Sequence, residues 1–197
     1  MKITIPESLE DITIKQYQEF IVLCDSNPKE YKLVNGLLKI FCGINNAEDV
    51  SEKDRGSIVG LINKALRNGG LFSDKPFMYK GEPYGMIPNF DKITGIEHKN
   101  IDLFGKLEES KYKISNIKAD SLHLFAAVVF RKVKKGKKFN KYKIVGYEET
   151  IEEADNMLSL PMSKIIGIES FFLTIYQDLE IHIQKSTQKE QEKEERL

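Results

Sequence analysis

The chain has 197 residues, of which 41% are apolar, and this is enough for the core of one large domain or two small ones. Its 30 basic and 30 acidic side chains balance, so no net charge draws the whole molecule to nucleic acid or to a membrane. The first ten residues contain acids and a proline where a signal peptide has basic and apolar segments. No apolar stretch reaches the roughly 18 residues of a membrane-spanning helix. We therefore expect a soluble intracellular protein.

The first third of the chain predicts a short strand and three amphipathic helices. Lys2 to Ile5 alternates polar and apolar residues, as a strand does. Thr13 to Gln16 has the spacing of a capping box before the first helix. The second helix is expected to begin at Asn27 to Glu30, with a cap, a proline and an acid, and the third at Ser51 to Asp54. Residues 1–72 are therefore predicted to form a compact helical unit.

Apolar residues recur at helical spacing in all three segments, which predicts one buried stripe on each helix. The stripes comprise Ile14, Tyr17, Ile21 and Cys24; Val34, Leu37, Leu38 and Phe41; and Ile58, Leu61, Ile62, Ala65 and Leu66. Gly43 is expected to end the second helix in a left-handed conformation. Cys24 and Cys42 have no CxxC spacing, so we expect both to be buried free thiols in a reducing compartment.

The composition and hydrophobic pattern change after residue 72, and residues 73–183 are predicted to form an α+β unit. Prolines, glycines and alternating aromatics predict a hairpin over Pro76 to Asp91, with strands Phe77–Tyr79 and Tyr84–Ile87 and a partly buried Tyr84 ring. A short helix is expected from Ile101 to Glu109. The unit would follow the helical unit directly.

The apolar run from Leu122 to Phe130 fits a buried helix or a buried strand, and Ser121 as its cap favours the helix. Lys141 to Val145 alternates like a strand and would close a second hairpin. Pro161 starts a long helix with an apolar stripe to Ile183, and residues 184–197 form a charged tail. The fold class predicted is mainly α with small β hairpins (α+β): an N-terminal helical unit, a central hairpin and a long C-terminal helix.

No pattern in the sequence predicts catalysis. The three histidines, His98, His123 and His182, share no metal-ligand spacing with either cysteine. Nucleophile-elbow, phosphate-loop and dinucleotide motifs are lacking. His123 beside an apolar run is expected to be a hydrogen-bonded core or rim histidine. We therefore predict a protein without catalytic residues, metal or cofactor.

Two segments are candidates for partner binding. A basic run from Arg131 to Lys143 contains no acid, and its Lys134, Lys135, Lys137 and Lys138 are the candidate nucleic-acid contacts. The run is poor in arginine and aromatics, so we favour a solvated hairpin tip whose lysines deter strand pairing. Phe171, Phe172 and Tyr176 widen the stripe of the last helix, and they fit either the core or a partner-binding face.

Three segments together resemble proteins encoded among the tail, baseplate and virion genes of contractile-tailed and crAss-like bacteriophages. Tyr84 to Thr94, followed by Ile101-Asp102-Leu103, is similar to "YGFIPNLDxIT…IDL". Leu122 to Tyr147 is similar to a helix followed by "YRP", a lysine-rich turn and "KYxIxxY". Leu160 to Leu179 is similar to "MPLxxxxGxxxFFxxLxxxL". The chain departs from these patterns at Lys132, where the family has proline, at Leu160, where it has methionine, and by extra residues after Thr94.

The resemblance covers roughly residues 77–183 and brings no catalytic residue with it. It implies a non-enzymatic tail or baseplate protein, either an assembly factor or a minor virion component. An assembly factor would be found in the host cytoplasm during assembly, and a minor virion component in the virion as well. The partners implied are other tail, baseplate and virion proteins, and a homo-oligomer is a further prediction. The candidate partner-binding residues are Tyr84, Pro88, Asn89, Asp91, Arg131, Phe171, Phe172 and Tyr176. The alternative is a nucleic-acid-associated virion (cargo) or regulatory protein using the basic loop 131–143.

Overall fold

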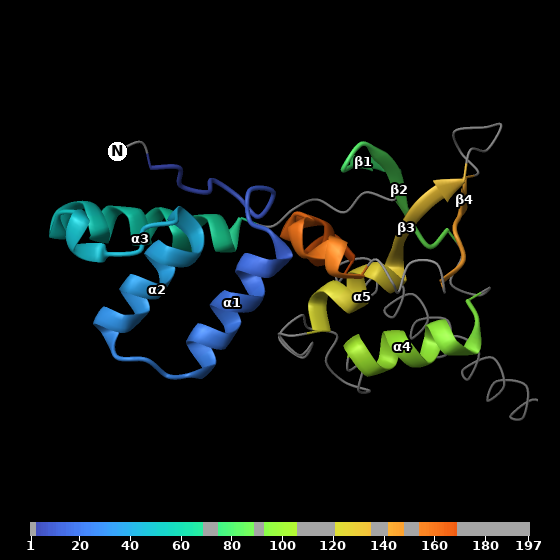
Figure 1. Ribbon diagram of the computed structural model, residues 1–197, viewed down its shortest axis with the longest axis horizontal. Coiled ribbons are helices and arrows are strands. Elements are labelled where there is room, and N and C mark those ends of the chain that lie inside the picture. The colour runs from blue at the N-terminus through green and yellow to red at the C-terminus, as the bar shows by residue number, and fades with distance from the viewer. Residues whose placement is uncertain are drawn as a thin grey trace, which may run out of the picture.

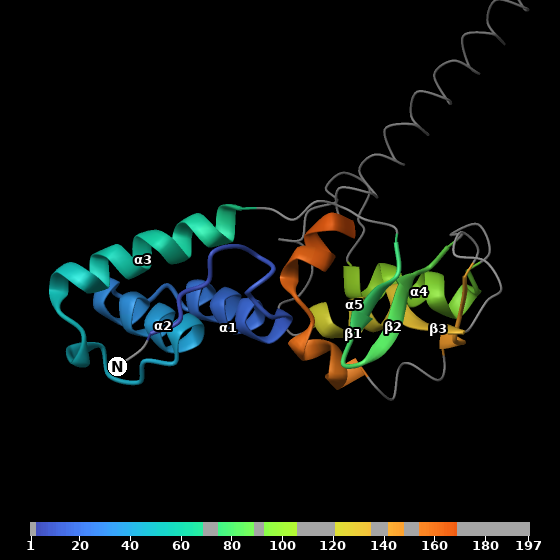
Figure 2. The same cartoon turned by 90° about the horizontal axis from the view of Figure 1, so that it is seen from above.

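The computed structural model describes residues 3–68, 75–88, 93–105, 121–134, 142–147 and 154–168. This part consists of helices and a four-stranded antiparallel sheet, which confirms the predicted mainly helical α+β class. Three N-terminal helices lie at one end, and the sheet with two further helices lies at the other (Figures 1 and 2). Residues 154–168 lie between the two ends.

The N-terminal helices begin and end largely where their caps predict. Helix α1 (Ile14–Asp25) starts with a capping box: the Gln16 amide donates to Thr13 Oγ1 at 3.2 Å, and the Thr13 amide donates to Gln16 Oε1 at 3.0 Å. Helix α2 (Glu30–Cys42) ends at Gly43, whose φ of 68° is left-handed as predicted. Helix α3 (Glu52–Arg67) is capped by Ser51, and a short 3-10 turn, η1 (Ala47–Asp49), precedes it.

Several predictions for this unit are wrong. Residues 3–7 form no strand, and the cap of α2 is Lys29, since Asn27 takes a left-handed φ of 45° before the helix starts. Cys24 is exposed because the buried side of α1 runs through Ile14 and Gln18 instead. Leu61 is 47% exposed because Ile58, Ile62 and Ala65 occupy the core side of α3. The other stripe residues are buried or pack against the core.

The sheet has the order β1-β2-β3-β4, from β1 (Phe77–Tyr79), β2 (Glu82–Met86), β3 (Phe130–Lys134) and β4 (Lys143–Ile144). The predicted hairpin is confirmed as the antiparallel pair β1–β2, with Tyr84 only 4% exposed. Its turn is two residues, Lys80 and Gly81, with φ of 49° and 79°. Positive φ at both positions is what a type I′ hairpin turn requires.

Two helices pack beside the sheet. Helix α5 (Leu122–Val129) confirms the helical interpretation of the apolar run, and Phe130 already belongs to β3. Helix α4 (Gly95–Gly105) begins six residues before the predicted start at Ile101. The earlier start follows from a cap that the prediction missed, because the Glu97 amide donates to Thr94 Oγ1 at 3.3 Å.

The N-terminal segment joins the two ends of the molecule. The Ile14 amide donates to the Leu160 carbonyl at 2.9 Å, and the Met162 amide donates to the Ile12 carbonyl at 2.7 Å. Ile12, Ile14 and Leu160 are fully buried in one continuous core. The 3-10 helix η5 (Ala154–Ser159) leads into this contact. Residues 9–14 are thus packed as part of the second predicted unit as well as the first.

Residues 162–168 are helical, so the predicted C-terminal helix starts directly after Pro161. The rest of that helix, the tail 184–197 and the predicted boundary at residues 72 and 73 lie outside the described residues. Within the described residues, no helix is long and apolar enough to cross a bilayer.

Candidate functional site

The most closely connected polar group in the described part centres on Arg131 of β3. Its side chain is 4% exposed, and its Nη2 lies 2.5 Å from Glu97 Oε1 on α4. Its Nε donates to the Val128 carbonyl at 3.0 Å and its Nη1 to the Val145 carbonyl at 3.3 Å. The guanidinium therefore ties α4, the end of α5 and the segment after β4 together. A buried cation needs such a complete set of partners, because its lost hydration is not otherwise replaced.

Glu97 is held in place by the start of its own helix. Its Oε2 accepts a hydrogen bond from the Thr94 amide at 2.5 Å, while its Oε1 faces Arg131. Burial alone would raise the pKa of this carboxyl. Hydrogen bonds from the Thr94 backbone and hydroxyl, together with the charge and hydrogen bond of Arg131, outweigh it and hold the pKa below its ordinary value. The pair is therefore ionised near neutral pH and electrically balanced.

Tyr147 completes the group. Its ring lies 5.9 Å from the Arg131 guanidinium carbon, and its hydroxyl accepts from Asn100 Nδ2 at 2.6 Å. Burial raises the pKa of the Tyr147 hydroxyl. Tyr147 is thus a neutral, hydrogen-bonded side chain packed beside the ion pair, and these contacts stabilise the fold.

A glycine in β2 provides a second close contact. A Cβ added to Gly85 would lie 2.5 Å from Cε2 of the Tyr142 ring, so this ring can lie flat against the strand only because position 85 has no side chain. The Tyr142 hydroxyl also donates to the Met86 carbonyl at 2.8 Å. Tyr142 therefore fixes the segment before β4 across β2.

The structure describes three of the eight predicted partner-binding residues, namely Tyr84, Pro88 and Arg131. Tyr84 and Arg131 were expected on a binding surface, but the structure buries both: Tyr84 packs against Phe77 and Tyr79, and Arg131 is paired internally. Pro88 is exposed just after β2. The remaining candidates, Asn89, Asp91, Phe171, Phe172 and Tyr176, lie outside the described residues.

The candidate nucleic-acid contacts are only partly described. Lys134 is exposed at the end of β3, and Lys135, Lys137 and Lys138 lie outside the described residues. The register places Lys134 directly opposite Lys143 of β4, so both side chains project from the same face of the sheet. Lys132 lies two residues earlier on this face and is half-buried. We call these three residues the lysine face.

His123 has the hydrogen-bonded position that was predicted. Its Nδ1 lies 3.1 Å from Gln18 Nε2 of α1, and its Nε2 lies 3.8 Å from a carboxylate oxygen of Asp155. This contact links α1 to α5 and η5. His98 is exposed, and His182 lies outside the described residues. Throughout the described ranges, no three His, Cys, Asp or Glu side chains are grouped as metal ligands would be.

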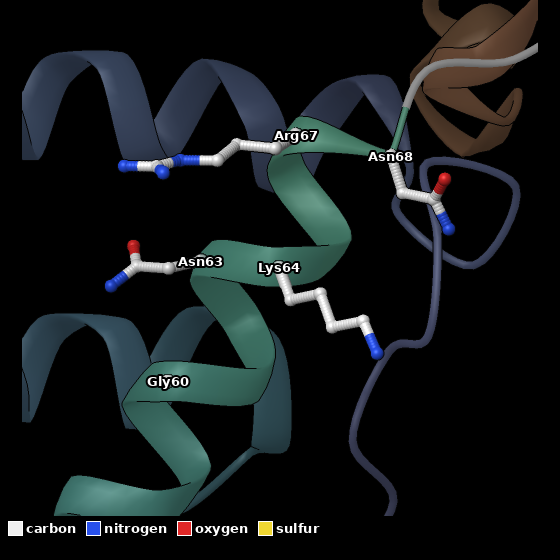
Figure 3. A pocket seen from close by; sticks show the side chains of 5 residues that line it. All are labelled: Gly60, Asn63, Lys64, Arg67 and Asn68. Carbon is white, nitrogen blue, oxygen red and sulfur yellow. The ribbon is translucent and has the colours of Figure 1, made fainter.

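The surface also has shallow hollows. One of about 480 Å³ lies at the C-terminal half of α3, lined by Gly60, Asn63, Lys64, Arg67 and Asn68. Figure 3 shows Asn63 and Arg67 directed to one side of the helix and Lys64 and Asn68 to the other. Its described lining provides two cations, Lys64 and Arg67, and two amides, Asn63 and Asn68, and none of these residues was predicted as a site residue.

Sequence reasoning missed Glu97, Asn100, Tyr147 and Gly85. One signal was present: Thr94 and Glu97 have the spacing of a capping box. Another was the chemistry of Arg131, the one arginine in a run of lysines. A scan against protein-family models gave no match, and neither did searches of curated proteins and of solved structures.

Proposed function

We propose that the chain is a non-enzymatic bacteriophage protein that acts in tail or baseplate morphogenesis, as an assembly factor or a minor virion component. The proposal rests on the sequence resemblance, and one structural observation supports it. The first two resembling segments pair directly, because β2 comes from the first and β3 from the second, and the buried residues of 160–168, from the third, belong to the same core cluster. Patterns that a family shares across separate segments are expected to meet in this way when they encode a common framework.

Two polar residues of these segments, Arg131 and Tyr142, hold elements of the fold together. Arg131 is neutralised by Glu97 of α4, and Tyr142 packs on Gly85 of β2. Each of these contacts joins two elements of the fold. A protein whose shared residues hold its elements together suits a role in assembly, where a rigid surface is presented to partners in the tail or baseplate.

Mass spectrometry of purified phage particles, compared with lysate of infected cells, tests this proposal. Recovery from the particle assigns a virion component. Recovery from the lysate only, bound to tail or baseplate proteins, assigns an assembly factor. The proposal fails if the protein is found in lysate with no tail or baseplate protein and is absent from the particle.

A further inference from the structure

The cationic side chains of β3 lie on opposite faces of the sheet. Arg131 faces α4 and is buried, while Lys132 and Lys134 alternate onto the opposite face. Lys143 joins them there, directly across from Lys134. The structure therefore places one paired cation inside and a row of three cations on the other side of the same two strands.

Lys134 and Lys143, the two exposed residues of this row, repel each other across the two strands. Like charges directly opposite each other weaken a sheet, and neither Lys134 nor Lys143 forms an ion pair among the described residues. Continuing the pairing of Tyr84 with Lys132 by two residues places Glu82 of β2 across from Lys134, so this line of the sheet holds two exposed lysines, Lys134 and Lys143, and one exposed acid. An anionic partner would relieve this repulsion.

We propose that the lysine face of β3 and β4 docks an acidic surface of another protein. A protein partner is favoured over nucleic acid by the residue types. The aromatic rings described on the same face are taken up by the core: Tyr79, Tyr84 and Phe130 are buried, and Phe77 packs against Tyr84 and Phe130. These rings cannot stack on bases. The strand's arginine, the better phosphate reader, is committed to Glu97.

Binding of two probes tests the inference: a glutamate-rich peptide and a duplex DNA of similar total charge, each titrated into the full chain at physiological salt. The variant Lys134→Glu/Lys143→Glu is compared with Lys53→Glu/Lys64→Glu, which makes the same charge change at exposed positions on α3. We expect the first variant to bind the peptide at least about tenfold more weakly, and the second to stay within about twofold of the unmodified chain.

The single variant Lys143→Glu separates binding from folding. It creates an opposite-charge pair with Lys134 and leaves Lys134 in line with Glu82, so its melting temperature should match or exceed that of the unmodified chain while peptide binding weakens. Three results would overturn the inference: an equal loss in the α3 control, tighter binding of DNA than of peptide, or no peptide binding by the unmodified chain. None of these measurements depends on a role in tail assembly, so the two proposals fail separately.

Discussion

Replacing Arg131 by methionine is the most severe test of the buried polar group formed by Arg131, Glu97, Asn100 and Tyr147. The change keeps an unbranched side chain but removes the cation that Glu97 faces at 2.5 Å and the donors to two carbonyls. Glu97 would remain buried, with 7% of its side chain exposed and no counter-ion. Removing one partner of a buried ion pair costs about 3–5 kcal/mol, a large share of the roughly 5–15 kcal/mol that stabilises a typical domain.

Urea unfolding at neutral pH, followed by circular dichroism, measures this loss. Lys134→Met on the same strand is the matched control, because Lys134 is exposed, and its change should stay within about 0.5 kcal/mol. The double variant Arg131→Met/Glu97→Met should recover most of the loss, since an apolar pair replaces the ions. It should stay about 1 kcal/mol short because Glu97 also caps α4. A loss below about 1 kcal/mol for Arg131→Met would refute this account of the network.

Further predictions follow from the same contacts. The pKa of Glu97 is lowered in the folded chain, so its stabilisation is fully present above the ordinary value of 4.5 and is lost as pH falls through the lowered folded-state pKa. The difference between the urea midpoints of Glu97→Gln and the unmodified chain should therefore begin to shrink below pH 4.5 and vanish only below the folded-state pKa. Gly85→Ala should lower the free energy of unfolding by about 1–3 kcal/mol, because the new methyl group forces the Tyr142 ring away. Gly60→Ala is the control: a Cβ there has nothing within 4 Å, so the variant should be more stable by about 0.5–1 kcal/mol in thermal melts. Equal effects of the two variants would contradict the contact between Gly85 and Tyr142. Ile12→Ala should cost about 2–5 kcal/mol and lower the melting of helices and sheet together, and two separate transitions would show that the ends unfold independently.

Local chemistry made much of the fold predictable. The capping residues Thr13 and Ser51, the stop at Gly43 and the alternating aromatics of the first hairpin each act within a few residues of chain. Such signals can be recognised in the sequence because the hydrogen bonds that they predict join residues only a few positions apart. The start of α4 could have been found the same way, from Thr94 and its partner three residues on.

The interior of the site was not predictable in this way. Arg131 lies in a basic run whose composition predicts a solvent-exposed segment. Its side chain faces α4 only because β3 pairs with β2 in this register. Its partner Glu97 is 34 positions away, and no spacing rule connects them. The exposure of Cys24 has a similar cause, because the buried position on α1 goes to Gln18, which meets His123 more than a hundred residues later.

The proposed function places the gene in a bacteriophage genome, and deleting it there tests this claim most directly, with particles examined by electron microscopy and the gene supplied in trans as the control. The account predicts heads with missing or incomplete tails or baseplates, restored by the unmodified gene. Particles with normal tails, baseplates and infectivity would contradict it.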